Sequence, residues 1–269
     1  MAERPGLEAY RRLLGGAVRS QLAYPASFGL QLVGQALAQA VDLLAILVLF
    51  GRVAAMGGFS RDEVLLIYGL ASVGFGLADL AVGQLDRLPD LIRSGELDAM
   101  LLRPLSVLGQ LCAADLALRR LGRVVAGAVT LGYALLAVEI TWTPARVALV
   151  IVSPLSAAVI LGAIWVAAAS VCFWVVDGRE LASSVTYGSN VFTSYPITIF
   201  SDWVRRLLAF VVPGAFVAYY PVLGLLGKPD PLGLPAVLRW CAPLVAMATV
   251  AAATLVWRTG LRRYVGTGS

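Results

Sequence analysis

The strongest constraint on this chain is a succession of apolar stretches, each long enough to cross a lipid bilayer. A helix needs about 20 apolar residues to span the hydrocarbon core. Stretches of this kind occupy residues 26–50, 63–84, 121–142, 145–176, 182–200 and 236–257. Only 14% of the residues are charged, against about a quarter in soluble domains. The sequence therefore predicts an all-α, polytopic membrane protein with residues 1–269 in a single transmembrane domain.

A seventh apolar stretch, residues 207–227, is interrupted by Pro213, Gly214 and Pro221. Proline removes a backbone donor and breaks a helix, and broken backbone at membrane depth is tolerated where protein surrounds it. We expect a re-entrant hairpin of two half-helices that enters and leaves on the outer side. The alternative stays open at this stage, with 207–227 crossing the membrane and 182–200 not crossing it.

The distribution of basic residues favours six crossings. Arginines flank both ends of the chain, and cytosolic loops carry an excess of Lys and Arg. Six crossings bring both termini to the cytosol, together with two thirds of the 21 Lys and Arg residues. We predict a multi-pass protein of the inner (cytoplasmic) membrane with cytosolic N- and C-termini.

The N-terminal segment predicts a helix that lies in the plane of the membrane surface. Apolar residues recur at helical spacing from Leu7 to Leu22, while Glu8 and Arg12 fall on the other side. This pattern is typical of an interfacial amphipathic helix, here at residues 6–22. The segment lacks the continuous apolar core of a secretory signal.

Two of the predicted spans carry a polar stripe. In the first span it consists of Gln31, Gln35, Gln39 and Asp42. In the fifth it consists of Ser183, Thr186, Asn190 and Ser194. Polar and charged groups at membrane depth face protein or water rather than lipid. Each stripe therefore indicates a substrate path or a subunit interface, and hydrogen bonding between helices of one subunit is the alternative.

Small residues line one face of the second span. They are Gly69, Ser72, Gly76 and Gly83. Such a face lets another helix approach closely. Asp79 lies on the same face near the cytosolic end, and we expect it to pair with Arg119, Arg120 or Arg123.

The chain offers little for catalysis. It has no histidine and three widely separated cysteines, so we expect buried thiols and no metal or redox centre. The stretch DGRELA at 177–182 starts like the acidic motif of membrane phosphatidyltransferases, but the second pair of acids is missing. The only Gly-Lys pair, Gly227-Lys228, precedes a proline, so there is no P-loop to cradle nucleotide phosphates. The scattered arginines argue against a nucleic-acid partner, and we expect no catalytic residue and no cofactor in this chain.

A charged segment, residues 85–104, interrupts the apolar pattern between the second and third spans. Leu88 and Ile92 share one helical face, Gly95 suits a helix C-cap, and Pro104 ends a second short helix. The pattern predicts two short helices on the cytosolic surface. Such an apolar helical face is suited to docking a soluble partner.

The sequence IRSGELDAMLLRPL in this segment resembles the coupling region of a permease family in the ABC-2 exporter superfamily. The matching residues are Ile92, Gly95, Leu97, Asp98, Leu101, Leu102, Arg103 and Pro104. Three later stretches resemble landmarks of the same family: SYPITIF at 194–200, VVPGAFVAYYP at 211–221 and LRRYVGTGS at 261–269. The resemblance covers essentially the whole chain, although the ending VGTGS departs from the expected Ser-Thr-Gly-Ser or Gly-Ala-Gly-Ser type of tail.

The resemblance implies a type V exporter-like fold, with six spans, the interfacial helix, a cytosolic coupling helix and a re-entrant outer hairpin. It also implies two permease subunits, the second being the same or a related chain, and two separate ATPase subunits that bind ATP and Mg. In this arrangement the apolar contacts with the ATPase are expected from Leu88, Ile92, Leu97 and Leu101. The orientation of the ATPase on the permease is expected to be fixed by Arg93, Asp98 and Arg103.

The sequence thus predicts a permease of an ATP-driven exporter, which moves a small molecule or lipid-like substrate, such as a drug or antibiotic, out of the cell. A carrier driven by an ion gradient is the alternative, although Asp42 is the only acid well inside a span. A membrane scaffold without transport is a third hypothesis.

Overall fold

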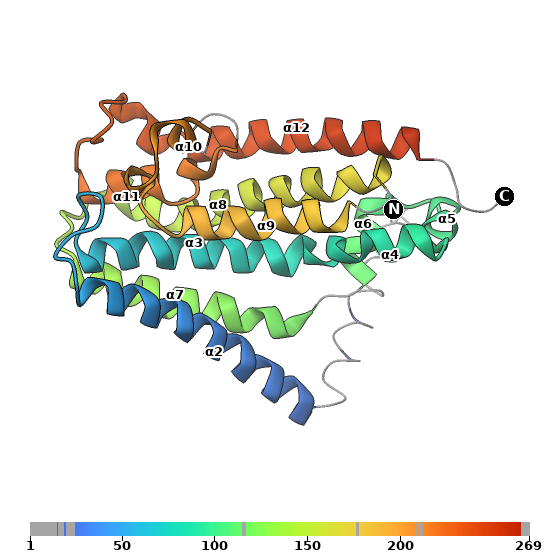
Figure 1. The fold of residues 1–269 in the computed structure, drawn as a ribbon, viewed down its shortest axis with the longest axis horizontal. Helices are drawn as coiled ribbons and strands as arrows, with labels where there is room; N and C mark the ends of the chain where they lie inside the picture. The colour runs from blue at the N-terminus through green and yellow to red at the C-terminus, as the bar shows by residue number, and fades with distance from the viewer. Residues whose placement is uncertain are drawn as a thin grey trace, which may run out of the picture.

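The computed structural model shows a bundle of long helices that lie side by side (Figure 1). It describes residues 15, 19, 25–114, 117–175, 178–207, 209 and 212–264. Over these residues the chain is helical, with no β-strand and one isolated β-bridge between Met56 and Phe59. The all-α prediction is confirmed for this part of the chain. The expected interfacial helix at 6–22 lies outside the described residues, apart from Gly15 and Arg19.

Four helical stretches in the described ranges are long and apolar enough to cross a membrane. They are α2 (Pro25–Phe50), α3 (Arg61–Val82) continued by η1 (Gly83–Arg87) and α4 (Leu88–Arg93), α8 (Pro144–Ser170) with η3 (Val171–Phe173), and α12 (Ala242–Arg263). Helix α7 (Leu121–Ala137) is apolar but shorter. Helix α9 (Arg179–Thr193) is amphipathic, and the Pro196 that follows it is a residue that cannot continue a helix.

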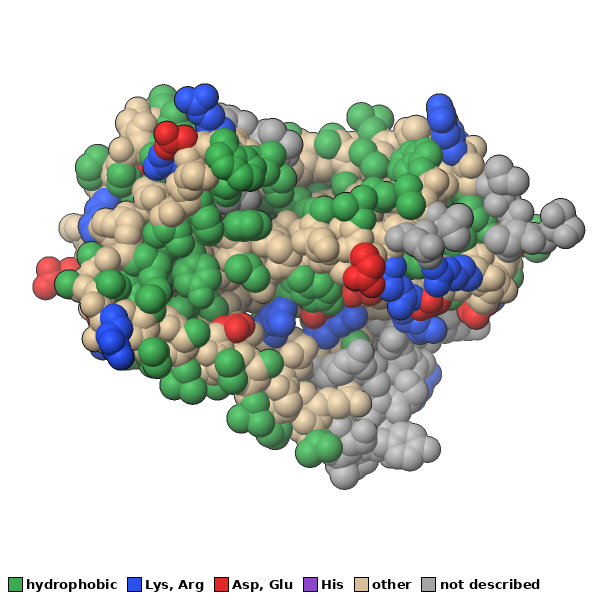
Figure 2. All heavy atoms as spheres, in the orientation of Figure 1, with side chains coloured by type: hydrophobic (Ala, Val, Ile, Leu, Met, Phe, Trp, Pro, Cys, Tyr) green, Lys and Arg blue, Asp and Glu red, His purple; other side chains and the backbone are tan. Residues whose placement is uncertain are grey.

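Short helices close the two ends of the bundle (Figure 1). At one end lie α4, α5 (Glu96–Leu101), α6 (Val107–Ala114) and η2 (Leu118–Arg120). At the other end lie α10 (Asp202–Arg206), η6 (Gly214–Phe216), α11 (Tyr219–Leu226) and η7 (Ala236–Trp240), and η4 (Ile197–Ile199) follows α9. Figure 2 shows charged side chains gathered around the α4 and α5 end, with apolar side chains along much of the bundle.

Helix α3 is the centre of the bundle. It packs against α7, α8 and α9, while α12 lies on the far side of α8. Of the most apolar window of α3, 83% is buried, against 11% for α2. The core is therefore built around α3, and α2 is a peripheral helix.

Small residues bring α3 and α7 close together. A Cβ added to Gly69 would lie 2.6 Å from the backbone nitrogen of Leu131, and one added to Gly127 would lie 2.9 Å from the backbone nitrogen of Val73. These distances are too short for any larger side chain, so the two backbones are in direct contact. The expected small-residue packing face of the second span is confirmed.

Helix α2 diverges from the bundle towards its N-terminal end (Figure 1). Apolar side chains cover its outer face, and Leu37, Val41 and Val48 are 61%, 64% and 69% exposed. An apolar surface of this extent on a membrane helix faces lipid or another subunit.

Helix α9 buries its polar face and exposes its apolar face, the reverse of an amphipathic helix in a soluble protein. Its polar side chains Thr186, Ser189 and Thr193 are buried, whereas Leu181 and Val191 are exposed. A soluble helix buries its apolar stripe in the core. The exposed apolar face of α9 therefore suits a lipid or protein environment rather than water.

The end of the bundle at α11 is held together by polar contacts. Lys228 Nζ lies 2.7 Å from each carboxylate oxygen of Glu63 at the start of α3. The hydroxyl of Tyr219 donates to Asp230 at 2.8 Å. Helix α11 is buried but has only eight residues, too few to cross a bilayer. These features fit the re-entrant hairpin at 207–227, which stays a prediction.

The close approach of α3 and α7 yields a stability test with a matched control on the same helix. Gly127→Ala should destabilise the protein by about 1–3 kcal/mol, because the new methyl group overlaps α3. Gly132→Ala should be neutral or stabilising by up to about 1 kcal/mol, since nothing lies within 4 Å of its Cβ position and alanine favours the helix. Denaturant unfolding of the purified chain in detergent measures both. Equal effects of the two substitutions would contradict the packing.

Candidate functional site

The charged segment 85–104 folds into two short helices, as the sequence predicts. Helices α4 and α5 meet at Ser94 and Gly95, and Gly95 adopts a left-handed conformation with φ of 74°. Only glycine takes this conformation readily, so the turn is fixed at this position. The pair lies at the end of the bundle opposite α11 (Figure 1).

The apolar face of this segment is directed into the chain's own core. Leu88 and Leu97 have no exposed surface, and Leu85 is 1% exposed. We therefore correct the expectation that Leu88 and Leu97 touch a partner. Their burial anchors the two short helices to the bundle, and burying a leucine contributes about 1.5–3 kcal/mol.

The large apolar side chains that the segment exposes lie at its tip, defined here as Leu101, Leu102, Arg103 and Pro104. Leu102 is 88% exposed and Leu101 is 43% exposed. The structure leaves Arg93 exposed as well, whereas Ile92 and Asp98 are half-buried. Of the residues expected to contact a partner, those of the tip and Arg93 are accessible in this arrangement.

Gln110, on α6, holds the end of α5 in place. Its side chain is 2% exposed, and its Nε2 donates to the carbonyl oxygens of Met100 at 2.9 Å and Leu105 at 3.2 Å. The bond to Met100 adds to those that the same carbonyl oxygen accepts from the backbone amides of Leu102 and Arg103 at the end of α5. The sequence analysis did not single out Gln110. Burial raises the pKa of the neighbouring Cys112 thiol to about 11, so this thiol stays protonated and unreactive at neutral pH.

A buried ion pair lies where α3 passes into η1. The Nε of Arg120 lies 3.0 Å from Oδ1 of Asp79, and their side chains are only 12% and 9% exposed. Arg120 Nη1 also donates to the carbonyl oxygen of Asp79 at 2.9 Å and to Oε1 of Gln84 at 2.7 Å. The expected pairing of Asp79 with one of the three arginines is confirmed for Arg120. This contact ties η1 to the start of α7.

Asp86 connects η1 to two further helices. Its carboxylate accepts a hydrogen bond from Trp165 Nε1 on α8 at 2.9 Å and another from the Tyr187 hydroxyl on α9 at 3.0 Å. The two rings also contact each other and Phe75 of α3, and the rings of Phe75 and Trp165 stack with centroids 5.4 Å apart. We call Asp86, Trp165 and Tyr187 the Asp86 junction.

A third connection is an ion pair between Asp90 on α4 and Arg179 at the start of α9. Both side chains are about half exposed, so the pair contributes little stability. Its position still fixes α4 next to α9. The Asp86 junction and the Asp90–Arg179 pair thus attach the segment to α8 and α9, and the Arg120 contacts attach the residues just before it to the start of α7.

Sequence reasoning missed the Asp86 junction. Trp165 and Tyr187 lie 79 and 101 residues from Asp86, and no spacing pattern brings them together. The available signal was a tryptophan and a tyrosine, each with a polar group that needs a partner, inside or beside apolar stretches.

Part of the polar stripe of α2 forms hydrogen bonds with another helix of the same chain. Gln39 is 6% exposed, and its Nε2 donates to the Tyr68 hydroxyl at 2.7 Å and to Ser72 Oγ at 3.0 Å. Hydrogen bonding between helices of one subunit therefore applies to Gln39. Gln31 and Asp42 remain exposed.

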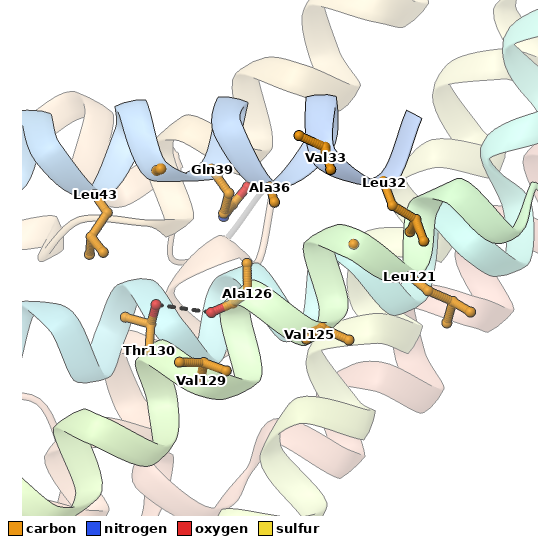
Figure 3. Close-up of a pocket in the computed structure, with 12 residues that line it drawn as sticks. Leu32, Val33, Ala36, Gln39, Leu43, Leu121, Val125, Ala126, Val129 and Thr130 are labelled. Atoms are coloured by element: carbon orange, nitrogen blue, oxygen red, sulfur yellow. Dashed lines mark hydrogen bonds between the residues drawn. The ribbon is translucent and has the colours of Figure 1, made fainter. Parts of the chain in front are cut away.

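An apolar groove of about 580 Å³ separates α2 from α7 (Figure 3). Gln39 and Thr130 are the polar side chains in its lining, and Thr130 donates to the Ala126 carbonyl of its own helix. Gln35 lies beside the groove, with its Cβ 3.2 Å from the position of a Cβ added to Gly122. The groove suits an acyl chain or an apolar side chain.

The polar stripe of α9 lies against the chain's own helices. Thr186 and Ser194 are buried, and Ser183 and Asn190 are half-buried. Ser194 Oγ donates to the Asn190 carbonyl at 2.7 Å. Helix α9 packs mainly on α8 and its exposed face is apolar, and a role of the polar stripe in a substrate path or a subunit interface stays a prediction.

These features define a polytopic helical membrane protein with a charged end. Within the described residues, no group of three or more His, Cys, Asp and Glu side chains could hold a metal ion. A family model described as ABC-2 family transporter protein matches residues 36–268. The chain therefore belongs to the ABC-2 transporter family, a family of ABC transporter permeases. Comparisons with curated proteins and with solved structures give no match.

Membership of this family has two consequences. Its permease domains are membrane components rather than catalytic ones, and they imply association with ABC ATPase partners.

The Asp86 junction can be tested by a double-mutant cycle. Asp86→Asn and Tyr187→Phe should each destabilise the protein by about 1–3 kcal/mol, as expected for hydrogen bonds to a charged group. Because the two groups share a bond, the double variant should deviate from additivity by about 0.5–3 kcal/mol. Denaturant unfolding measures the cycle. Tyr133→Phe, at a 51% exposed position on α7, is the control and should be additive with Asp86→Asn; additivity with Tyr187→Phe would refute the junction.

Proposed function

We propose that this chain is the permease subunit of an ATP-driven ABC exporter, and that segment 85–104 receives the motion of a separate ATPase. The observation that supports the proposal is an exposed tip on a segment that Asp86 and Asp90 attach to α8 and α9, directly after residues that are paired with Arg120 at the start of α7. The tip is accessible to a partner, while the anchoring leucines and the Asp86 junction keep it from moving independently. A plain connecting loop needs none of these contacts.

In this proposal six helices cross the membrane: α2, α3, α7, α8, α9 and α12. Each coincides with one of the apolar stretches of the sequence. The exposed apolar face of α9 supports counting this helix among the membrane spans, although the helix as a whole is polar. The short helices η6 and α11 then belong to the re-entrant hairpin, residues 207–227, on the outer side.

The orientation follows from the charges. The end that carries α4 and α5 is cytosolic, together with both termini, in an inner (cytoplasmic) membrane, and the end with α11 is outside. This arrangement brings the larger share of Lys and Arg to the cytosol. The whole chain then forms one permease domain.

The mechanism we propose is a rigid-body displacement. The ATPase subunits, which bind the ATP and Mg, contact Leu101, Leu102 and Arg103 at the tip of the permease. Their closure moves α4 and α5, and Arg120 and Asp86 carry the displacement to α7, α8 and α9. A shift of packed helices of this kind switches a transporter between two arrangements.

A second permease subunit, the same or a related chain, is proposed to pack on α2. Little of α2 is buried, and its exposed face combines large apolar residues with Gln31 and Asp42. A carboxylate at membrane depth is costly unless it faces protein or water. The path for a small or lipid-like substrate would then lie between the two subunits, along this face.

Exposed Asp42 also supports the alternative of a carrier driven by an ion gradient, since a titratable group in a span can bind a coupling ion. Liposomes that contain this chain alone discriminate the two. Uphill transport powered only by an ion gradient would favour the carrier and exclude the ATP-driven permease.

Substitutions at the tip test the docking of the ATPase. Leu102→Asp and Arg103→Glu should each reduce co-purification of the ATPase and transport by roughly tenfold, because a side chain at the centre of an interface contributes about 1–2 kcal/mol. Both residues are exposed, so folding should be preserved. Arg52→Glu, an exposed residue at the far end of α2, serves as the charge-matched control. Unchanged co-purification in both tip variants would exclude this segment as the docking site.

Cross-linking tests the position of the second permease. In a variant without the native cysteines, Val41→Cys on α2 should form a disulfide-linked pair of permeases under oxidation. Leu136→Cys, on α7 and 91% exposed, is the control and should stay uncross-linked. Electrophoresis without reductant measures both. Cross-linking of Leu136→Cys in place of Val41→Cys would assign the interface to another face.

A further inference from the structure

A polar pocket of about 400 Å³ lies at the α11 end of the bundle, away from the segment 85–104. It is lined by Thr141, Thr143, Ala145, Arg146, Gly224, Gly227, Arg239 and Trp240. The lining combines two arginines with two threonines and contains no carboxylate. Neither the coupling site nor the substrate path accounts for it.

The first arginine, Arg146, lies in the first turn of α8. Its Nη1 donates to the carbonyl oxygen of Thr141 at 2.7 Å, which fixes the direction of the side chain. The guanidinium lies directly against Gly227, where any Cβ would collide with Nη2. Arg146 is therefore held at the end of α11 and half-buried.

The second arginine, Arg239, lies in η7. Its Cβ would be 3.4 Å from a Cβ on Gly224, one turn of α11 before Gly227. Its Nε is buried and has no hydrogen-bond partner among the described residues. A buried donor without a partner costs about 1–3 kcal/mol, and more in a charged group.

Both arginines therefore line the same pocket beside the last turn of α11, Arg146 with its guanidinium at Gly227 and Arg239 with its Cβ at Gly224. The acids nearest in sequence, Glu139 and Asp230, are not part of the lining, and Asp230 accepts through Oδ1 from the Tyr219 hydroxyl. Two cations that share a pocket without a carboxylate repel each other unless an anion lies between them. The start of α8, with Thr143 as its N-cap, adds the positive end of a helix to the same lining.

We infer that this pocket binds a phosphate group, through Arg146, Arg239 and the threonine hydroxyls. The planar guanidinium matches the oxygens of phosphate and binds them bidentately. The phosphate can be free in solution or belong to the headgroup of a phospholipid. Bound there, it links α11 and η7 to the start of α8, and so stabilises the end of the bundle. The inference rests on these contacts and not on the proposed function.

The test uses the full-length chain, purified and placed in nanodiscs. Inorganic phosphate is titrated into nanodiscs of a phosphate-free glycolipid, and separate nanodiscs contain phosphatidylglycerol. Unfolding temperature and native mass spectrometry report stabilisation and bound molecules. The double variant Arg146→Gln/Arg239→Gln should bind the phosphate-bearing probe roughly tenfold more weakly for each arginine lost, as expected for charge-assisted hydrogen bonds. Arg52→Gln/Arg206→Gln removes the same charge from exposed positions and should bind like the wild type.

Stabilisation by inorganic phosphate assigns the site to a free anion, and stabilisation by phosphatidylglycerol alone assigns it to a lipid headgroup. Both results support the inference when the arginine variants lose the effect. If the double variant does not fold, the single variants Arg146→Gln and Arg239→Gln replace it, each with a loss of about tenfold. Equal binding of both probes by wild type, arginine variants and control would overturn the inference, as would a wild type that binds neither.

Discussion

The contact between the backbones of α3 and α7 determines how the core of this chain is arranged. A helix in lipid gains little from burying apolar side chains, since lipid is equally apolar, so close packing must supply the attraction. Gly69 and Gly127 allow that packing because neither has a side chain where the other helix approaches. Because α3 is fixed in this way between α7 and α8, its continuation through η1 and α4 has a defined direction. The position of the segment 85–104 therefore depends on these glycines.

The charged side chains of this fold fix the relative positions of the helices and add little stability. Burying an ion pair such as Asp79 and Arg120 costs desolvation energy that the attraction repays only with good geometry. What such a contact does provide is a unique arrangement, because any other one would leave a charge without a partner. The Asp86 junction acts in the same way through two neutral donors, and it connects helices that are far apart in the chain. The permease we propose thus has rigid links where its partner is expected to act.

Much of the fold could be predicted from the sequence, because apolar length and arginine distribution constrain a membrane helix strongly. The turn at Gly95, the small-residue face of α3 and the partner of Asp79 followed from local rules. The direction of Leu88 and Leu97 did not, since an apolar helical face indicates burial without saying what buries it. The polar stripe of α9 is ambiguous for a related reason: Ser194 bonds to the backbone of its own helix, whereas the buried Thr186 hydroxyl has no hydrogen-bond partner among the described residues. The Asp86 junction and the two-arginine pocket depend on tertiary contacts that no spacing encodes.

The continuous helical stretch from Arg61 to Arg93 has 33 residues, which corresponds to about 50 Å at 1.5 Å per residue. A bilayer with its headgroups measures about 40–45 Å. In the orientation that we propose, the stretch is longer than the membrane is thick, and the turn at Gly95 lies beyond the phosphate layer in water. The proposed ATPase then reaches Leu102 and Arg103 without displacing lipid, because α3, η1 and α4 follow one another without a loop.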